Sequence, residues 1–175
     1  MSEPRIRSER LLLRTLMPED APRIRELAND RRIADRVVSF PHPYPEGMAE
    51  QWIATHRQKR EAGEAFNFGI ELRRSGELVG SISIEKIAGG KGEVGYWLGV
   101  DWWGQGLMTE ACRALCGFGF GVLGLDALEA QHLQRNPASG RVLEKAGFVR
   151  MGLEYRLVRE KEELVVLYRC TAPGD

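Results

Sequence analysis

The sequence predicts an α/β (α+β) fold in which a mixed β-sheet of about seven strands is flanked by about four helices. Three observations support this prediction. The length of 175 residues is that of about one domain, so residues 1–175 are expected to form a single domain. The spacing of apolar residues changes between helical and strand periods along the chain. A strand, a glycine-rich loop and a helix follow one another in mid-chain, after a β-hairpin.

Two helices follow the first predicted strand, residues 6–16. Pro18 favours the first turn of a helix, and apolar residues recur after it at helical spacing. The segment 40–45 contains three prolines, which fix φ and remove N–H donors, so a loop is expected there. A second amphipathic helix is predicted from Met48 to about Gly63.

From residue 66 onward the apolar period becomes that of strands. Alternation predicts a hairpin of strands 66–73 and 78–85, followed by a strand at 93–100. A helix with one apolar face begins at about Gly106. The remaining predicted elements are a strand at 127–133, a helix at 137–146, and strands at 149–158 and 163–169.

The composition excludes several classes of protein. Hydrophobic residues at 43% and charged residues at 29% exclude wholesale disorder, and 25 basic against 25 acidic residues argue against a nucleic-acid partner. The longest apolar run, 116–125, contains four glycines and is shorter than the ~20 residues of a membrane span. Three cysteines cannot form a closed disulfide framework, and the first residues lack a secretory apolar region. We therefore expect a cytoplasmic protein with no membrane partner.

Glycine is the compositional outlier, and its distribution locates the region of interest. The chain has 20 glycines, and 11 of them lie between Gly89 and Gly124. Within this region a strand feeds the loop 101–106, which opens a helix. The first N–H groups of a helix lack partners and its dipole favours negative charge, so this unit predicts a site for phosphate or pyrophosphate.

Known nucleotide motifs fit this unit only in part. The P-loop pattern G-x-x-x-x-G-K-[ST] does not occur in the chain. Gly104-x-Gly106-x-x-Thr109 differs from the dinucleotide pattern at one glycine, and Glu129 lies 20 residues beyond Thr109, near where a ribose-binding acid would be. The unit nevertheless follows a hairpin, and repeated βαβ halves are missing. NAD binding stays an alternative.

Two segments carry a family resemblance. Trp103–Ala111, W-G-Q-G-L-M-T-E-A, resembles the acyl-CoA loop of the GNAT N-acetyltransferases. Asn136–Phe148 resembles the next conserved block of that superfamily, about 30 residues later. Arg10–Arg14, R-L-L-L-R, and the proline-rich segment 40–45 resemble the ribosomal-protein (RimJ/RimL-like) branch. The resemblance covers nearly the whole chain and implies the GNAT fold, with a splayed sheet.

The resemblance implies acetyl-CoA as co-substrate. The superfamily pattern Q/R-x-x-G-x-G/A falls on Trp103, Gly106 and Met108, so its first and last positions depart from the pattern, although the RimJ/RimL-like branch commonly has Trp first. Backbone N–H groups of the loop would hold the pyrophosphate. Strand backbone at 98–100, where the family has a bulge, and Asn136 would contact the pantetheine, and Arg141 a phosphate. The implied cofactor-binding residues are Leu98, Gly99, Val100, Trp103, Gly104, Gln105, Gly106, Met108, Thr109, Asn136 and Arg141.

Acetyl transfer to an amine needs a base for the amine proton, donors for the oxyanion and an acid for the thiolate. Glu93 is the candidate base, because superfamily members with a glutamate base often carry it near here; an exposed acid at a strand start is the alternative. Glu129 is the second candidate and is assigned to the acceptor site, the alternative being a carboxylate paired with an arginine.

The block after Asn136 offers the candidate acid. Asn136 before Pro137 is also a typical helix start, which explains both residues structurally. Ser139 is the candidate donor to the leaving thiolate, or it packs. Many superfamily members carry a tyrosine acid seven residues after the asparagine, but that position is Leu143 here.

The acceptor is expected over the proline-rich loop, at Phe40, His42 and Tyr44, although a solvated loop histidine explains His42 equally. The spacing of Cys112 is that of a core residue, and no cluster has metal-ligand spacing, so no metal is expected. The acceptor is a protein N-terminal α-amine or a small-molecule amine. A non-catalytic acyl-CoA-binding module on the same fold is the alternative, and the sequence leaves open a homodimer.

Overall fold

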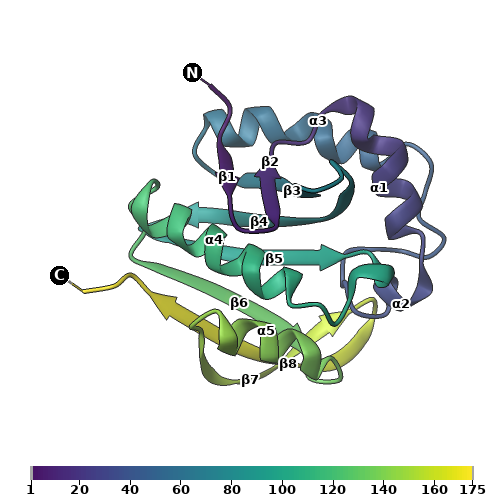
Figure 1. Ribbon diagram of the computed structural model, residues 1–175. Helices are drawn as coiled ribbons and strands as arrows, with labels where there is room; N and C mark the ends of the chain where they lie inside the picture. Colours follow the sequence, from purple (N-terminus) through teal and green to yellow (C-terminus); the bar gives the residue numbers. More distant parts are fainter. Residues whose placement is uncertain (1, 175) are drawn as a thin grey trace.

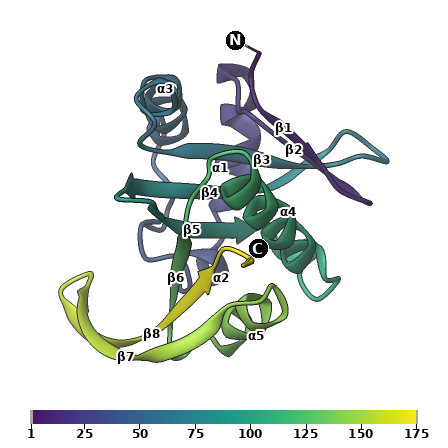
Figure 2. The same cartoon turned by 90° about the vertical axis from the view of Figure 1, so that its left-hand side faces the viewer.

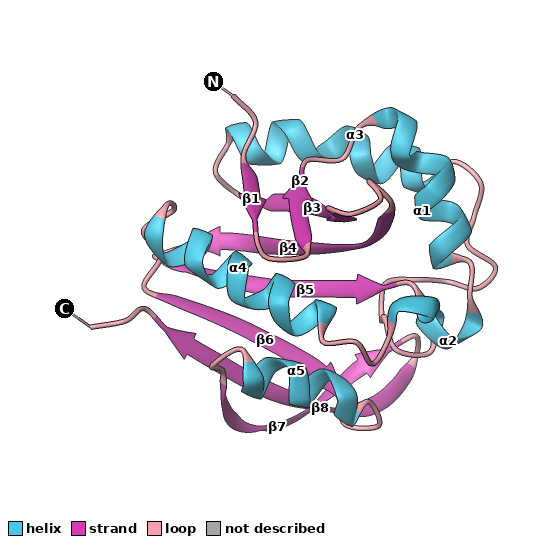
Figure 3. Ribbon diagram, in the orientation of Figure 1, coloured by secondary structure: helices cyan, strands magenta, loops and turns pink. Residues whose placement is uncertain are grey.

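The computed structural model describes residues 2–174, which build one mixed β-sheet with helices against it (Figures 1 and 3). The strands are β1 (Arg5–Arg7), β2 (Leu11–Arg14), β3 (Phe66–Leu72), β4 (Leu78–Ala88), β5 (Lys91–Leu98), β6 (Ala127–Leu133), β7 (Val149–Val158) and β8 (Lys161–Thr171). The helices are α1 (Ala21–Ala28), α2 (Arg31–Ala34), α3 (Met48–Glu61), α4 (Leu107–Gly121) and α5 (Pro137–Lys145). The strand order is β1-β2-β3-β4-β5-β6-β8-β7.

The helices form two layers, one on each side of the sheet (Figure 2). Successive side chains of a strand point to opposite faces, and β5 shows this division. Val94 and Leu98 belong to the core that α4 covers, whereas Trp97 belongs to a second core with Ile24 of α1 and Ile53 of α3. Within residues 2–174, no helix is long and apolar enough to cross a membrane.

The predicted fold class is confirmed, with one more strand and one more helix than expected. The Ser8 N–H donates to the Leu11 carbonyl at 2.9 Å, which breaks the predicted strand 6–16 into the hairpin β1–β2. The additional helix, α2, has four residues and is capped by the Asp30 carboxylate, which accepts from the Arg32 N–H. A helix of one turn is too short to produce a recognisable periodicity.

The prediction that the strand continues through Gly99 and Val100 is wrong. β5 ends at Leu98, and Val100–Trp102 form a 3₁₀ turn in which the Trp102 N–H donates to the Gly99 carbonyl at 3.0 Å. The Trp102 ring lies so close to Gly99 that a Cβ atom there would be 2.9 Å from it. Gly99 and Val100 therefore lead the chain away from the sheet into the glycine loop.

The central feature of the sheet is the separation of β5 from β6. Their parallel pairing runs from Lys91↔Ala127 to Val94↔Ala130 and then stops. β5 stays paired with β4 as far as Leu98, and β6 stays paired with β8 as far as Leu133. The two strands consequently form a V that opens beyond Val94.

The V forms without the bulge expected at residues 98–100. The β4–β5 register is continuous from Gly80↔Leu98 to Glu85↔Glu93, and its irregularity lies beyond Glu85, at the other end of the pair. β5 and β6 each keep a continuous outer partner where they part, so the V opens without an interruption of either outer pairing.

A buried histidine lies between α3 and the sheet. His56 is 4% exposed and packs edge-to-face against Trp52, with ring centroids 4.5 Å apart. Neither ring nitrogen has a hydrogen-bond partner among residues 2–174. Burial lowers the pKa of His56 to about 4, and the positive charges of Lys59 and Arg60 add to this effect.

We expect acid destabilisation through His56. Its pKa is about 4 in the folded state and about 6.5 in the unfolded chain, so the unfolded state binds more protons between these values. The free energy of unfolding should fall as pH drops from 6.5 to 4, by at most about 3 kcal/mol from this residue. His56→Phe should flatten that part of the profile in urea unfolding experiments. An unchanged slope in the variant would show that other groups cause the pH dependence.

Candidate active site

The N-terminus of α4 forms an open cradle for an anion. Gly106 caps the helix with φ of +75°, a left-handed conformation that favours glycine, and no described side chain caps it. The Glu110 N–H donates to the Gly106 carbonyl, so the N–H groups of residues 107–109 precede the first intrahelical bond. Gly104 is also left-handed, with open space where a Cβ would be. Free N–H groups and the helix dipole together favour phosphate here.

Arg10, which the sequence analysis did not assign to the site, lies beside this cradle. Its Nε donates to Glu110 Oε1 at 2.8 Å and its Nη1 to the Gln105 carbonyl at 2.9 Å. Partial burial raises the pKa of Glu110, but hydrogen bonds from Ser8 and Arg10 outweigh it and hold that pKa below its ordinary value. The ion pair ties the β1–β2 turn to α4 and places a guanidinium next to the helix N-terminus.

The side chains of the predicted loop residues mostly shape the loop. Trp103 Nε1 donates to the Leu98 carbonyl at 2.7 Å, and the Arg36 guanidinium lies 4.4 Å from the centre of its ring. Gln105 Nε2 donates to the Asp101 carbonyl at 3.3 Å. Met108 is 7% exposed in the core. An anion would therefore meet mainly the backbone of this loop, which explains how it tolerates Trp and Met at the pattern positions.

Helix α5 supplies the other wall of the V. Asn136 is the N-cap residue of α5 and Pro137 its first residue, as a typical helix start predicts, although the Asn136 side chain makes no capping hydrogen bond with a described residue. Ser139 Oγ lies 2.7 Å from the phenol oxygen of Tyr96, which also donates to the Ser139 carbonyl at 3.1 Å. Arg141 is exposed and makes no hydrogen bond to any residue from 2 to 174.

Tyr96 is a further site residue that sequence reasoning missed. It lies on β5 just past the point where β6 departs, packed against the core under α4 and α5. Burial raises the pKa of Tyr96 well above its ordinary value, and the hydrogen bond with Ser139 opposes this only in part. The phenol is therefore protonated at neutral pH and can donate a hydrogen bond.

Carboxylates occupy the opposite face of the sheet at the apex of the V. Glu93 is the register partner of Glu85 on β4 and of Glu129 on β6, and register partners share a face about 5 Å apart. Glu93 Oε2 lies 3.4 Å from Lys86 Nζ, and its side chain is 35% exposed. Glu129 is exposed and forms no ion pair with a described residue, although Arg169 is its register partner on β8. The two base candidates are thus side by side.

The strand surface next to Glu93 is open. Gly95 is exposed in the middle of the sheet, and a Cβ there would have only Ser83 Oγ nearby, at 3.7 Å. Glu93 and Trp97 flank it on the same face. The indole Nε1 of Trp97 is buried, and no described residue is its hydrogen-bond partner. This face of β5 therefore has room for a reacting group between a carboxylate and an aromatic ring.

The proline-rich loop is placed beside this surface with its aromatic residues turned inward. Phe40 and Tyr44 are 9% and 3% exposed, and the Phe40 ring packs edge-on against Trp97 with centroids 5.4 Å apart. His42 is exposed and lines a cavity of about 510 Å³. The structure thus joins Phe40 to Trp97, and of the three residues predicted for the acceptor site His42 is the exposed one.

Arg159 anchors this loop from the far end of the chain. Its Nη2 lies 2.7 Å from the Ala34 carbonyl and 2.9 Å from that of Val37, and it also bonds to the Phe40 carbonyl. Its Nε lies 3.3 Å from the Val38 carbonyl. Because more than 115 residues separate these partners, the sequence contains no local signal for the contact.

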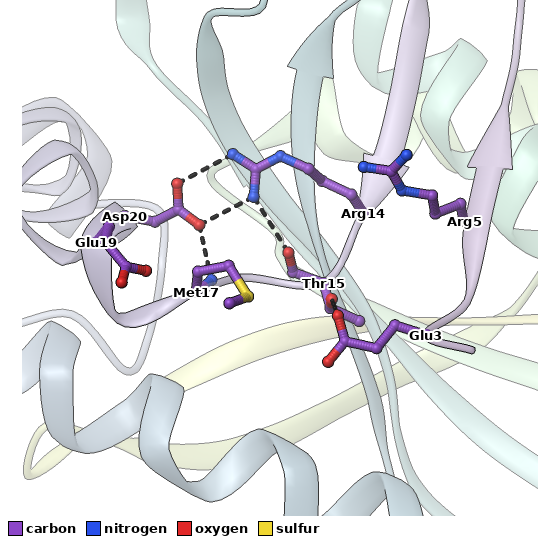
Figure 4. A pocket seen from close by; sticks show the side chains of 7 residues that line it. All are labelled: Glu3, Arg5, Arg14, Thr15, Met17, Glu19 and Asp20. Atoms are coloured by element: carbon purple, nitrogen blue, oxygen red, sulfur yellow. Dashed lines mark hydrogen bonds and ion pairs between the residues drawn. The ribbon is translucent and has the colours of Figure 1, made fainter. Parts of the chain in front are cut away.

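Figure 4 shows a second hollow, of about 330 Å³, which we do not assign to the active site. Its residues are Glu3, Arg5, Arg14, Thr15, Met17, Glu19 and Asp20. Arg14 donates to Asp20 at 2.9 Å and to Glu71 at 2.5 Å, so its charge is neutralised within the chain. Arg5 and Arg14 are register partners on β1 and β2, at the end of the hairpin that lies away from Arg10. Across residues 2–174, no group of three His, Cys, Asp or Glu side chains is arranged to hold a metal ion.

The sequence matches the acetyltransferase (GNAT) domain family over residues 10–149. The chain therefore belongs to the GNAT acetyltransferase family. The "Probable N-acetyltransferase YjcK" of Bacillus subtilis (strain 168) is 36% identical over 110 residues, which are 61% of this chain and 61% of that relative. The ribosomal protein uS5 alanine N-acetyltransferase of Escherichia coli (strain K12) is 26% identical over 178 residues, covering 97% of this chain and 91% of the relative.

The structure of RimL, a ribosomal α-N-protein acetyltransferase in complex with coenzyme A, has the same fold, with a TM-score of 0.88. It is 19% identical and covers 98% of this chain and 100% of that one. The prediction of a GNAT N-acetyltransferase with relatives among the ribosomal-protein acetyltransferases is confirmed. The dinucleotide-binding alternative is excluded, since every described strand pair except β5–β6 is antiparallel.

Loss of the Arg159 anchor should loosen the loop before Pro41. We expect Arg159→Gln to accelerate amide hydrogen exchange in residues 34–40 by about tenfold or more, because hydrogen bonds to a charged group are lost. Arg135→Gln is the matched control, since Arg135 pairs with Glu163 on the same hairpin without touching the loop. Equal exchange rates in wild type and Arg159→Gln would contradict the anchoring role.

Proposed function

We propose that this protein transfers an acetyl group from acetyl-CoA to a primary amine by direct attack, with no covalent enzyme intermediate. The observation that carries the proposal is the V between β5 and β6. One side of the V has an anion cradle at the α4 N-terminus, and the opposite sheet face has carboxylates at its apex. Cofactor and acceptor would therefore approach from opposite sides and meet at the exposed Gly95.

The residues present fit acetyl-CoA. The pyrophosphate would bind the N–H groups of residues 107–109, with Arg10 supplying positive charge. The edge of β5 from Gly95 to Leu98 lacks a β6 partner, so the backbone groups on that edge, apart from the Leu98 carbonyl that accepts from Trp103 Nε1, would be available to bond the pantetheine amides as a neighbouring strand would. Asn136, whose side chain makes no capping bond, would contact the same arm, and the exposed Arg141 a phosphate.

Ser139 and Tyr96 would stabilise the leaving group. As the C–S bond breaks, negative charge develops on the sulfur, and a hydroxyl donor within the V lowers the energy of that charge. Ser139 is bonded to a phenol that stays protonated at neutral pH, because burial raises the pKa of Tyr96. With the Tyr96 O–H donated to Ser139, the Ser139 hydroxyl would act as the donor to the sulfur, and the thiolate would take its proton from solvent.

Glu93 would act as the general base. The amine nitrogen forms the new N–C bond while its proton passes to Glu93, directly or through one water molecule. Glu85 and Glu129, on either side of Glu93, make this face negative and favour an acceptor that arrives as an ammonium ion. The acceptor is an α-amine of a protein N-terminus or a small-molecule amine, which would pass between Trp97 and the loop of His42. The free thiols of Cys112, Cys116 and Cys170 suit a cytoplasmic enzyme.

Gly106→Asp should abolish acetyl-CoA binding, because it places a side chain and a negative charge at the pyrophosphate cradle. Calorimetric titration with acetyl-CoA measures this directly. Gly63→Asp is the matched control: Gly63 has φ of +70° and open space around it, and it follows α3, which packs on the other side of the sheet from α4, so the same charge and backbone strain are added away from the cradle. Normal acetyl-CoA affinity in folded Gly106→Asp would mean that the loop does not hold the cofactor.

Glu93→Gln should lower kcat at neutral pH about 100-fold with little change in acetyl-CoA affinity. Raising the pH should partly restore the rate, because more of the amine is then free of its proton. Glu85→Gln, one strand away in the same row, is the control and should keep the wild-type pH–rate profile. An unchanged profile in Glu93→Gln would remove Glu93 from the mechanism. Normal acetyl-CoA binding by the wild type without acetylation of any amine would favour a non-catalytic binding module.

A further inference from the structure

The edge strand β7 has an exposed apolar surface that acetyl transfer does not require. Its one strand neighbour among residues 2–174 is β8, so its other side is a free sheet edge. Five apolar side chains at alternate positions are exposed by 47–76%: Val149, Met151, Leu153, Tyr155 and Leu157. A long free edge with exposed apolar residues invites pairing with another strand, and natural proteins usually cover or charge such an edge.

The opposite edge of the sheet shows this usual protection. β1 has three residues, Arg5–Arg7, and two of them are arginines. A short cationic edge resists pairing with a copy of itself. β7 has ten residues and no lysine or proline. The contrast between the two edges indicates that β7 is covered in solution.

The sequence of β7 is complementary to itself in the antiparallel direction. Residues 153–157 read Leu-Glu-Tyr-Arg-Leu. When two copies pair about a two-fold axis at Tyr155, Leu153 faces Leu157 of the second copy and Glu154 faces Arg156. Every cross-strand pair is then apolar with apolar or acidic with basic. Such pairs each stabilise a sheet, whereas like charges directly opposite destabilise it.

The regular part of the β7 backbone is also centred on Tyr155. β7 has a register irregularity between Arg150 and Gly152, after which its pairing with β8 is continuous from Gly152↔Leu167 to Val158↔Lys161. The regular stretch is therefore Gly152 to Val158, and its midpoint is Tyr155. Glu154 and Arg156 are 50% and 40% exposed, so both remain accessible to a second chain.

We propose that a second copy of this chain pairs antiparallel with β7 about a two-fold axis at Tyr155, which joins the two sheets into one. The occupant is another copy because this edge matches its own sequence in both hydrophobicity and charge. The dimer leaves the V and the α4 cradle of each copy free, and it does not depend on the proposed acetyl transfer.

Charge reversal tests the pairing by analytical ultracentrifugation. The wild type should sediment as a dimer. Glu154→Arg places like charges opposite each other twice by symmetry and should raise the dimer Kd roughly 10- to 100-fold. The double variant Glu154→Arg/Arg156→Glu restores both opposite-charge pairs and should restore dimerisation. Glu61→Arg, which removes an exposed ion pair with Arg57 on α3, is the control and should leave the dimer intact.

A cysteine variant tests the register. Tyr155→Cys should form a disulfide between two copies on mild oxidation, because residue 155 faces itself, whereas Val149→Cys should not. A wild type that is monomeric at all concentrations would overturn the proposal. A dimer that is insensitive to Glu154→Arg, or that cross-links at 149 and not at 155, would also overturn it by placing the interface elsewhere.

Discussion

The structure depends on the separation of β5 and β6. The two strands pair in parallel for four residues and then part, because each keeps an antiparallel outer neighbour, β4 for one and β8 for the other. The separation leaves the side of β5 that faces β6 without a strand partner from Gly95 to Leu98, while the other side stays paired with β4. It also directs the chain after Leu98 into the glycine loop, so that α4 begins at the open end of the V. A buried sheet with unpaired backbone at its centre is costly unless a ligand satisfies those groups, and an acyl-CoA arm has amides suited to that role.

The pleat of β5 divides the chemistry between two faces. Val94, Tyr96 and Leu98 point toward α4 and α5, where Ser139 meets Tyr96. Glu93, Gly95 and Trp97 point to the other face, where the carboxylates and the Phe40 ring lie. In the proposed mechanism, β5 therefore holds Tyr96, which contacts the leaving-group donor, on one face and the base Glu93 on the other, three residues apart along the chain. This arrangement suits a direct transfer, because the thioester and the amine need not share an entrance. A substitution on β5 should therefore affect either the cofactor side or the acceptor side of the site, depending on which face the residue lies on.

Local sequence predicted the elements with strong periodicity and failed where distant residues decide the outcome. Strands 127–133 and 149–158 were predicted with the bounds they have in the structure, because their apolar alternation is clear and turn residues bound them. The β1–β2 turn was missed because Ser8 to Arg10 contains neither Gly nor Pro and is stabilised by Glu110. Arg10, Tyr96 and Arg159 were absent from the predicted site for the same reason: each acquires its role through a contact 43 or more residues away. Glu93 and Glu129 were predicted separately, and only the parallel register shows that they are neighbours.

Hydrogen exchange of the wild-type protein with and without acetyl-CoA tests most directly whether the V is the cofactor site. If it is, acetyl-CoA should protect the amides of Leu107, Met108 and Thr109, which precede the first intrahelical bond, together with those amides between Gly95 and Leu98 that face the open V, where β5 has no β6 partner. Amides of β3 should keep their rates. Protection of the loop amides alone would locate only the phosphates of acetyl-CoA. Protection confined to the cavity around His42, or no protection at all, would contradict the account.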